Sequence, residues 1–498
     1  MSTNNPYGHC GPEYHDSPMS MTRREMLKHC GMGLGMIGLS GLLQEEGLLA
    51  SSGPLGEQAL SPMAPKVPHF APKAKRVIWL FINGGPSHMD TWEYKPALEK
   101  YHDKELEGFD KFTGFFSKEV GAIMKSPFKF TPRGQSGKMV SEIFPHLGEH
   151  VDKMAFIHSL YSESNNHSPA LFMMNSGLPR TGFPCVGSWV TYGLGSESQD
   201  LPGFVVMSDP HERGLPKGGR SNWSSGFLPS VYQGTLLRHK GDPILNLRKP
   251  DSLSSSQQRA QVDLINQLNR WDMEQKSNDA ELSARIESFE LAYRMQTAAP
   301  EAFDIDRESE HTKKLYGMED SRCAHFGRQC LMGRRLLERG TRFIQIYSGG
   351  NENQRAWDGH IDILGNHTQF AGETDKPIAG LLTDLEQRGL LEDTLVIWGG
   401  EFGRLPVSQV GTLKPGRDHN PHGMTVWMAG GGTKGGVSFG ETDELGHKAE
   451  KDPVHINDFH ATILQLLGMD HERLTYKYNG RRFRLTDVAG KVIQEIIA

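Results

Sequence analysis

The stretch RVIWLFINGG at residues 76–85 decides the fold class, because a short run of β-branched and aromatic residues ends there in two glycines. Such a run predicts a buried strand. The same pattern recurs as TRFIQIYSGG at 341–350, DTLVIWGG at 393–400 and TVWMAGGG at 425–432. Strands with nearly continuous apolar residues are typical of parallel sheets that helices cover on both faces.

Helical patterns lie between and after these strands. Three segments each end at a glycine, which readily takes the left-handed conformation that follows a helix. The segments are 319–339, 368–388 and 457–467, with Gly340, Gly389 and Gly468 after them and Asn457 suited to cap the third. Alternating strands and helices predict an α/β fold with a largely parallel central sheet and helices on both faces. Residues 252–300 are predicted to be a helical insertion, and 203–248 only loops and short strands.

The composition is that of a globular protein. The 498 residues are 37% hydrophobic and 23% charged, with 54 Lys and Arg against 60 Asp and Glu, a net charge of −6. This length fits two or three domains, or one large α/β domain with insertions. The mild acidity argues against nucleic acid as a partner, because phosphate binding needs a clustered basic face. Five cysteines are too few for a disulfide scaffold.

The N-terminal residues read as an export signal. A paired arginine in TRREMLK (22–28) precedes the apolar, glycine-rich run CGMGLGMIGLSGLL (30–43), which is the twin-arginine pattern. This run is shorter than the ~20 residues that span a bilayer, so we expect a removable signal and no stable membrane anchor. An amphipathic helix is the alternative, although five glycines disfavour it. We therefore expect a leader and signal at 1–50, a linker at 51–75, the twin-arginine translocase as a partner, and a periplasmic or secreted protein.

Acidic residues and histidines gather where the predicted strands end. In open α/β sheets, ligands bind at the carboxyl ends of the strands. The residues there, or just before the fourth strand, are His88, Asp90, Asp358, His360, Glu401, Arg404, Arg417, Asp418, His419 and His422. Carboxylates mixed with imidazoles suit Zn²⁺ or Mn²⁺, whereas Mg²⁺ or Ca²⁺ prefers more oxygen ligands. Taken singly, each residue could instead cap a turn or form an ion pair.

The segment SESNNHSPALFMMNSG (162–177) predicts a polar loop that enters a short helix near His167 and Ser168. Free N–H groups at a helix N-terminus favour an oxyanion or an activated nucleophile. An ordinary Asn or Ser cap is the alternative. The sequence contains no G-x-S-x-G, Walker A, H-E-x-x-H or C-x-x-C motif, which argues against esterases of the α/β-hydrolase type, nucleotide-driven enzymes and zincins.

Taken together, these motifs resemble the secreted, twin-arginine "domain of unknown function 1501" family, which is grouped with the sulfatase-like branch of the alkaline-phosphatase-like superfamily. The segments that resemble it are GGPSHMDTWE (84–93), NNHSPALFMMNSG (165–177), WSSGFLPSVYQG (223–234), RAWDGH (355–360), GGEFGR (399–404), GRDHNPHG (416–423) and AGGGTKGG (429–436). The resemblance implies an alkaline-phosphatase/sulfatase-like α/β sandwich over residues 76–490. It also implies one or two divalent ions (Zn, Mn or Ca) and hydrolysis of phosphate or sulfate esters.

By order along the chain, the resemblance also implies roles for individual residues. Asp90 is similar to the first metal ligand, Asp358 and His360 to a ligand pair, and His419 or His422 to a late ligand. The nucleophile position falls at His167 or Ser168. The sequence departs from the superfamily at Glu401-Phe402, where Asp-His is expected, so a second ion needs Asp418 or His88 as a replacement ligand. It also lacks the arginine of the sulfatase signature after NNHSP.

These observations lead to two hypotheses. The first is an exported metal-dependent hydrolase of a small-molecule or carbohydrate phosphate or sulfate ester, in which Arg404 and Arg417 stabilise negative charge. Its predicted metal ligands are Asp90, Asp358, His360, Glu401, Asp418, His419 and His422, and its predicted catalytic residues are His167, Ser168, Arg404 and Arg417. The second is a non-catalytic secreted binding or structural protein with a degenerate site, which Phe402 and the missing arginine favour.

Overall fold

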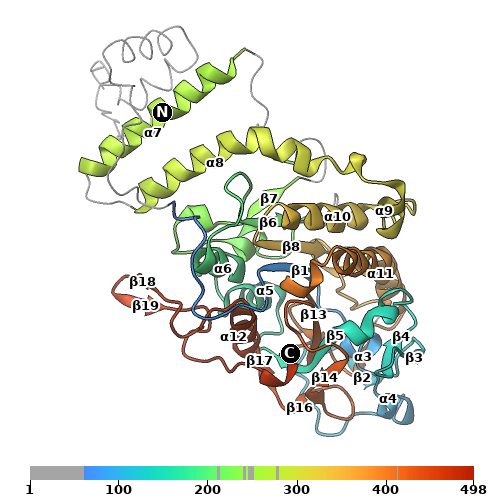
Figure 1. Cartoon of the computed structure of the whole chain (residues 1–498). Helices are drawn as coiled ribbons and strands as arrows, with labels where there is room; N and C mark the ends of the chain where they lie inside the picture. Colours follow the sequence, from blue (N-terminus) through green and yellow to red (C-terminus); the bar gives the residue numbers. More distant parts are fainter. Residues whose placement is uncertain (1–60, 210–212, 239–242, 245–251, 276–279, 412) are drawn as a thin grey trace, which may run out of the picture. The chain divides into compact units, whose positions relative to one another are not determined.

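The computed structural model of the protein describes residues 61–498, apart from 210–212, 239–242, 245–251, 276–279 and 412 (Figure 1). The predicted leader and signal (1–50) and residues 51–60 of the predicted linker lie outside the described residues. The chain forms two compact units, and of the smaller one only residues 252–268 are described. The larger unit spans Ala59–Lys249 and Asn269–Ala498 and contains the main sheet and the candidate site. No helix among the described residues is long and apolar enough to span a membrane.

A nine-stranded sheet forms the centre of the larger unit. Its strand order is β14-β5-β13-β9-β1-β8-β6-β7, and β17 also pairs with β5. The strands are β1 (Arg76–Ile82), β5 (Met154–Tyr161), β6 (Phe204–Met207), β7 (Thr235–Leu237), β8 (Phe343–Ser348), β9 (Thr394–Gly399), β13 (Met424–Ala429), β14 (Val437–Phe439) and β17 (Val454–His455). All pairings are parallel except those of β13 with β5 and β9. The predicted α/β fold with a largely parallel sheet is therefore confirmed.

Both faces of the sheet are buried, as the continuous apolar runs predict. Along β1, Val77, Trp79 and Phe81 point into one hydrophobic core, and the alternate residues of the strand point into the other. Figure 1 shows α5, α6 and α12 on one side of the strands and α10 and α11 on the other. These helices are α5 (His167–Ser176), α6 (Val186–Leu194), α10 (Ala324–Glu338), α11 (Ile363–Gln387) and α12 (Ile456–Leu466).

The predicted helix ends at glycine are confirmed, whereas one predicted helix start is wrong. Gly340, Gly389 and Gly468 all have positive φ angles of 66–90°, which is the conformation that ends a helix. The predicted cap of α12 at Asn457 is wrong, because His455 caps this helix. Its side chain accepts a hydrogen bond from Asn457 N, and Asp458 accepts one from His455 N in return.

Smaller elements complete the chain. The predicted helical insertion at 252–300 corresponds to α7 (Ser255–Gln275) and α8 (Ala280–Phe303). The other α-helices among the described residues are α3 (His88–Thr91), α4 (Pro96–Lys100) and α9 (Glu310–Leu315). Five strand pairs lie outside the main sheet: β2 (Val120–Ile123) with β11 (Val407–Gln409), β3 (Phe130–Arg133) with β4 (Lys138–Ser141), β10 (Gly403–Arg404) with β12 (His419–Asn420), β15 (Glu441–Thr442) with β16 (Ala449–Lys451), and β18 (Tyr476–Tyr478) with β19 (Arg481–Phe483).

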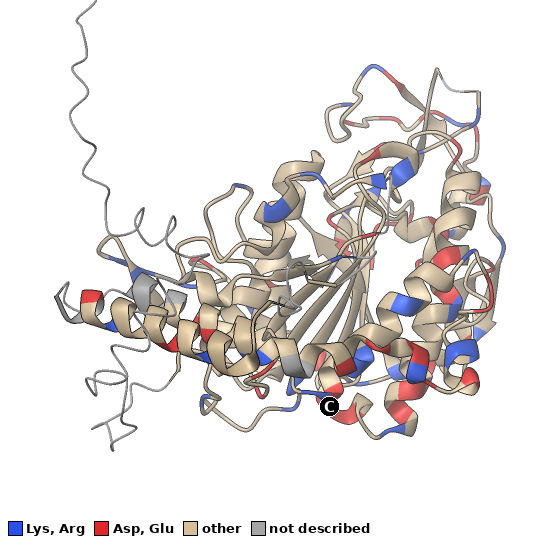
Figure 2. Cartoon of the chain, turned by 90° about the horizontal axis from the view of Figure 1, so that it is seen from above, with Lys and Arg blue, Asp and Glu red and all other residues tan. Residues whose placement is uncertain are grey.

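Charged residues show no segregation by sign in the part of the chain that the structure describes. In Figure 2, Lys and Arg are interspersed with Asp and Glu along the helices. A protein that binds nucleic acid needs a continuous basic stripe or face. This arrangement agrees with the charge balance of the sequence.

Truncation of a central core side chain tests the sheet packing. Ile346 in β8 is fully buried, so Ile346→Ala should lower the free energy of unfolding by about 2–5 kcal/mol. Ile361 is 49% exposed, so Ile361→Ala, the matched control, should change it by less than about 0.5 kcal/mol. Urea denaturation of both variants measures the difference. Equal effects would mean that Ile346 is not in the core.

Candidate metal centre

The candidate site lies where four parallel strands end. The strands β1, β5, β8 and β9 run in the same direction, so the segments that follow them meet at one edge of the sheet. His167 begins α5 after β5, Asp358 and His360 follow β8, and Glu401 follows β9. Because β13 runs antiparallel, the residue His419 that precedes it reaches the same edge.

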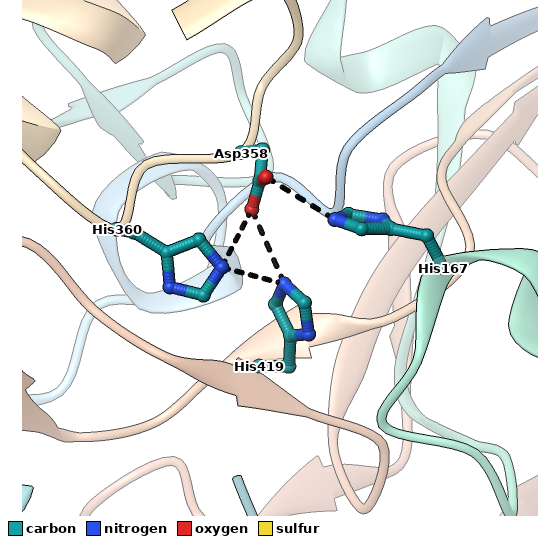
Figure 3. A group of neighbouring side chains, drawn as sticks. All are labelled: His167, Asp358, His360 and His419. Carbon is teal, nitrogen blue, oxygen red and sulfur yellow. Dashed lines mark hydrogen bonds and ion pairs between the residues drawn. The ribbon is translucent and has the colours of Figure 1, made fainter. Parts of the chain in front are cut away.

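Three imidazoles surround one carboxylate at this edge (Figure 3). The Nε2 atoms of His360 and His419 lie 2.8 Å apart and are 3.0 and 3.2 Å from Asp358 Oδ1. His167 Nε2 lies 3.2 Å from the other carboxylate oxygen, Oδ2. All four side chains are buried, and their ligand atoms lie within 4.8 Å of one another. The described chain therefore contains a buried His/Asp cluster able to hold a metal ion.

The outer nitrogen of each imidazole has a partner that fixes its orientation. Nδ1 of His167 lies 2.8 Å from Glu401 Oε1, that of His360 lies 2.8 Å from Gln409 Oε1, and that of His419 lies 2.7 Å from the backbone oxygen of Asn165. Since all three partners are oxygen acceptors, each Nδ1 carries the proton and donates it. When a ring is in its neutral form, its Nε2 then presents a lone pair to the centre of the cluster.

These lone pairs show that the residues fit a cation. Two neutral Nε2 acceptors at 2.8 Å, in His360 and His419, cannot donate to one another, and His167 Nε2 makes no hydrogen bond within the described structure. Histidine that binds a metal commonly donates its other N–H to a carboxylate, an amide oxygen or a backbone carbonyl. A divalent cation would satisfy the inward-facing nitrogens and the carboxylate together.

Asp358 is held as an anion by the groups around it. Burial opposes its ionisation, but the guanidinium of Arg404 beside it holds the pKa of Asp358 well below its ordinary value. Arg404 Nη2 donates to Oδ1 at 2.7 Å, and the backbone N–H of Asn353 donates to Oδ2 at 2.7 Å. These two donors fix the position of the carboxylate independently of the imidazoles.

The cluster has an excess of negative charge. The buried carboxylates of Asp358 and Glu401 lie near one buried guanidinium, that of Arg404. In the metal-free chain His167 compensates: burial favours its neutral form, but the two carboxylates outweigh this and raise the pKa of His167 to about 9. Burial and the charges of His167 and Arg404 hold the pKa of His419 well below its ordinary value. The two carboxylates and the one guanidinium therefore shift the pKa values of His167 and His419 in opposite directions.

Gly84 allows Glu401 to reach His167. The Gly84 N–H, just after β1, donates to both Glu401 oxygens at 3.0 and 3.2 Å. Gly84 has a φ of 110°, and a Cβ there would lie 2.7 Å from the backbone nitrogen of Trp357. Any other residue would be strained and would collide with the segment that leads to Asp358. The glycine pair after the first predicted strand therefore serves the site as well as the turn.

Aromatic rings close the sides of the cluster. The Phe402 ring lies 4.3 Å from that of His419 and 5.0 Å from that of His167, centroid to centroid. The Phe116 ring packs edge-on against His360 at 5.1 Å. Phe402 has no ligand atom, so the position at which the resemblance leads one to expect a histidine is occupied by an apolar wall. Rings at these positions exclude water from the carboxylate and the imidazoles.

The structure brings together only part of the predicted metal set. Asp358, His360 and His419 meet, and His167 joins them, whereas Glu401 orients His167 rather than facing the centre. Asp418 accepts hydrogen bonds from His419 N and Phe116 N, and its Oδ1 lies 3.6 Å from His360 Nδ1, the outward nitrogen. His422 and His88 do not belong to the group of ligand atoms found among the described residues.

Asp90 and the two arginines form buried structural contacts instead. Arg417 pairs with Asp90 through Nε at 2.7 Å and also donates to the backbone oxygens of Leu405 and Met124. Despite burial, this guanidinium keeps the pKa of Asp90 below its ordinary value. Arg404 donates to Asp358 and to the backbone oxygens of Gly84, Gly85 and Arg417. Both guanidinium groups are fully buried in these contacts, and Asp90 is not among the grouped ligand atoms of the described residues. The role of the arginines toward a substrate stays a prediction.

The sequence does not reveal the residues that orient the imidazoles. Gln409 lies on the short strand β11, and Asn353, which orients Asp358, begins a three-residue 3-10 helix between β8 and Asp358, so neither has a pattern to mark it. Ser168 donates its backbone N–H to the Asn166 side chain, which caps α5. The predicted helix start near His167 and Ser168 is therefore confirmed, and it is His167 that faces the cluster.

Comparison with protein families identifies the family of this chain. Residues 74–497 match the family described as "Protein of unknown function (DUF1501)", and the chain belongs to this family. No curated protein matches the chain.

Solved structures with similar folds are alkaline phosphatases and sulfatases, among others. The alkaline phosphatase from the Antarctic bacterium TAB5 is 12% identical over 81% of this chain and 99% of its own, with a TM-score of 0.34. The PsFucS1 sulfatase from Pseudoalteromonas sp. is 12% identical over 80% of this chain and 68% of its own, with a TM-score of 0.33. The lipoteichoic acid synthase LtaP from Listeria monocytogenes is 9% identical over 85% and 78%, with a TM-score of 0.30. At these identities the similarity concerns the fold alone.

The Asp90–Arg417 pair should contribute to stability and not to metal binding. Asp90→Asn leaves a buried guanidinium without its counter-charge, so the free energy of unfolding should fall by about 3–5 kcal/mol while the metal content is unchanged. Glu441→Gln, which breaks the exposed pair with Lys451, is the control and should cost at most about 1 kcal/mol. Loss of metal from an Asp90→Asn protein of normal stability would instead make Asp90 a ligand.

Proposed function

We propose that this protein is an exported metal-dependent hydrolase of phosphate or sulfate esters. The observation that supports it best is the convergence of three imidazole Nε2 atoms on the Asp358 carboxylate, with each Nδ1–H already donated to an oxygen. The export part of the proposal rests on the twin-arginine pattern at residues 22–43.

In this proposal Asp358, His360 and His419 hold one divalent cation. Their three ligand atoms are the closest set in the cluster, at 2.8–3.2 Å from one another. Two nitrogens and one oxygen favour Zn²⁺ or Mn²⁺ over Ca²⁺. When bound, such a cation polarises ester oxygens and lowers the pKa of a water from 15.7 to about 7. A second ion has no ligand at Phe402, and Glu401 is already engaged by Gly84 and His167.

His167 is assigned to proton transfer. It faces Oδ2 of Asp358, whereas His360 and His419 face Oδ1, so the ion can be held without His167. Its Nδ1 is fixed by Glu401, and its Nε2 has no hydrogen-bond partner among the described residues. A positioned imidazole with one free nitrogen can exchange a proton with an attacking water or a leaving oxygen. Because Arg404 and Arg417 are engaged, the cation and His167 would have to meet the developing negative charge themselves.

A non-catalytic binding protein is the second candidate. It is favoured by the engagement of both arginines and by the small exposure of the ligand residues, at most 7% each. In that case the cluster would bind an ion that only stabilises the fold.

Metal analysis tests the ligand set. Protein purified without chelator should contain about one Zn or Mn per chain, and His360→Ala and His419→Ala should each lose it, because two of the three ligands are insufficient. His422→Ala is the matched control: it changes a histidine of the same loop that lies outside the cluster and should retain the metal. Elemental analysis after gel filtration measures the content. Metal that survives both ligand substitutions would contradict the site.

Turnover of small esters tests the activity and the role of His167. We expect hydrolysis of p-nitrophenyl phosphate or sulfate with Zn²⁺ or Mn²⁺, and a fall of about 10²–10⁴-fold in kcat in His167→Gln with the metal content unchanged. Loss of metal from this variant would make His167 a fourth ligand. Bound metal without turnover of either ester would favour the binding protein.

A further inference from the structure

Exposed apolar side chains lie on the segments around the candidate metal centre. Five exposed side chains come from the three segments that supply or support the site. Phe112, Phe115, Ile361, Val410 and Leu413 are between 45% exposed and fully exposed, and we call them the apolar collar. Exposed apolar side chains are ordinary when scattered, but a group around a site marks an interaction surface.

Contacts with the cluster place the collar over the site. The Phe115 ring lies 5.9 Å from that of His419, so this exposed ring touches a proposed ligand. The backbone oxygens of residues 112–114 accept hydrogen bonds from the Asn165 side chain, and the Asn165 carbonyl accepts the one from His419 Nδ1. Asn165 therefore links residues 112–114 to the His419 imidazole through hydrogen bonds.

The aliphatic members are tied to the other proposed histidine ligand. Ile361 follows His360 directly, and Val410 follows Gln409, which accepts the hydrogen bond from His360 Nδ1. Leu413 precedes Lys414, whose ammonium pairs with Asp362 at 2.7 Å. The three segments are thus each tied to one of the two histidines by a direct contact or by sequence adjacency.

We infer that the ester has an apolar alcohol part, an alkyl or aryl group, which the apolar collar binds while the anionic group faces the cluster. This inference rests on the proposed function and narrows its substrate to an anionic amphiphile. Aliphatic side chains such as Ile361 and Leu413 offer no hydrogen bonds, so they suit a hydrocarbon better than a sugar.

Binding of butyl-, hexyl- and octylphosphonate, kept below micelle formation and measured by titration calorimetry, tests the inference. These compounds are not hydrolysed, so turnover does not enter the measurement. The association constant should rise about two- to fourfold for each added methylene as the chain covers the collar. An association constant independent of chain length would overturn the inference.

Variants locate the chain-length effect. The double variant Phe112→Ser/Phe115→Ser should lose most of the increase, and its unfolding midpoint should be unchanged because both rings are exposed. Val67→Ser/Val488→Ser, which removes exposed apolar residues elsewhere, should keep it. An equal loss in both variants would overturn the inference. A second result would also overturn the inference. If the unchanged protein is a dimer, the Phe112→Ser/Phe115→Ser variant alone is a monomer, and binding does not depend on chain length, then the collar binds a second copy of the chain.

The inference and the proposed function can fail separately. If esters are turned over but binding does not depend on chain length, the hydrolase function stands and the apolar substrate is ruled out. Chain-length dependence without turnover of any ester removes the hydrolase and leaves the collar as a binding site for an anionic amphiphile.

Discussion

The candidate site depends on three outward hydrogen bonds. Each imidazole gives its Nδ1 proton to an oxygen that cannot give one back, so each Nε2 faces inward with a lone pair. Without those acceptors the rings could rotate or change tautomer, and the nitrogens around Asp358 could pair with one another. With them the protein holds a preorganised set of buried electron-pair donors. Burying these polar atoms without partners costs free energy, and a bound cation would supply the missing partner.

The topology of the sheet makes this arrangement possible. Parallel strands bring the segments after β5, β8 and β9 to one edge, and the antiparallel β13 brings the segment before it to the same edge. A fully parallel sheet would place the start of β13, and His419 with it, at the opposite edge. The single reversed strand therefore allows a residue that precedes a strand to meet residues that follow strands.

The apolar runs predicted the fold because burial on both faces leaves a strong local pattern, as in β1 and β8. The pattern does not record direction, so the antiparallel β13 could not be inferred. Four residues of the candidate site could be predicted from their positions in the sequence. Asp358, His360 and His419 lie beside strand ends, and His167 lies at the start of a helix. Asp90 stands in an equally good place, but the sequence could not reveal that Arg417 faces it. Gln409 and Asn353 lie on very short elements, a three-residue strand and a three-residue 3-10 helix, and only the folded chain shows what they touch.

The central claim is that Asp358, His360 and His419 hold one ion between them. X-ray absorption spectroscopy of the metal-loaded protein at the Zn or Mn edge tests this most directly, because it reports ligand type and distance at the ion itself. The account predicts imidazole scattering from histidine ligands, together with oxygen, at about 2.0–2.2 Å. A shell of oxygen alone, without imidazole scattering, would contradict it.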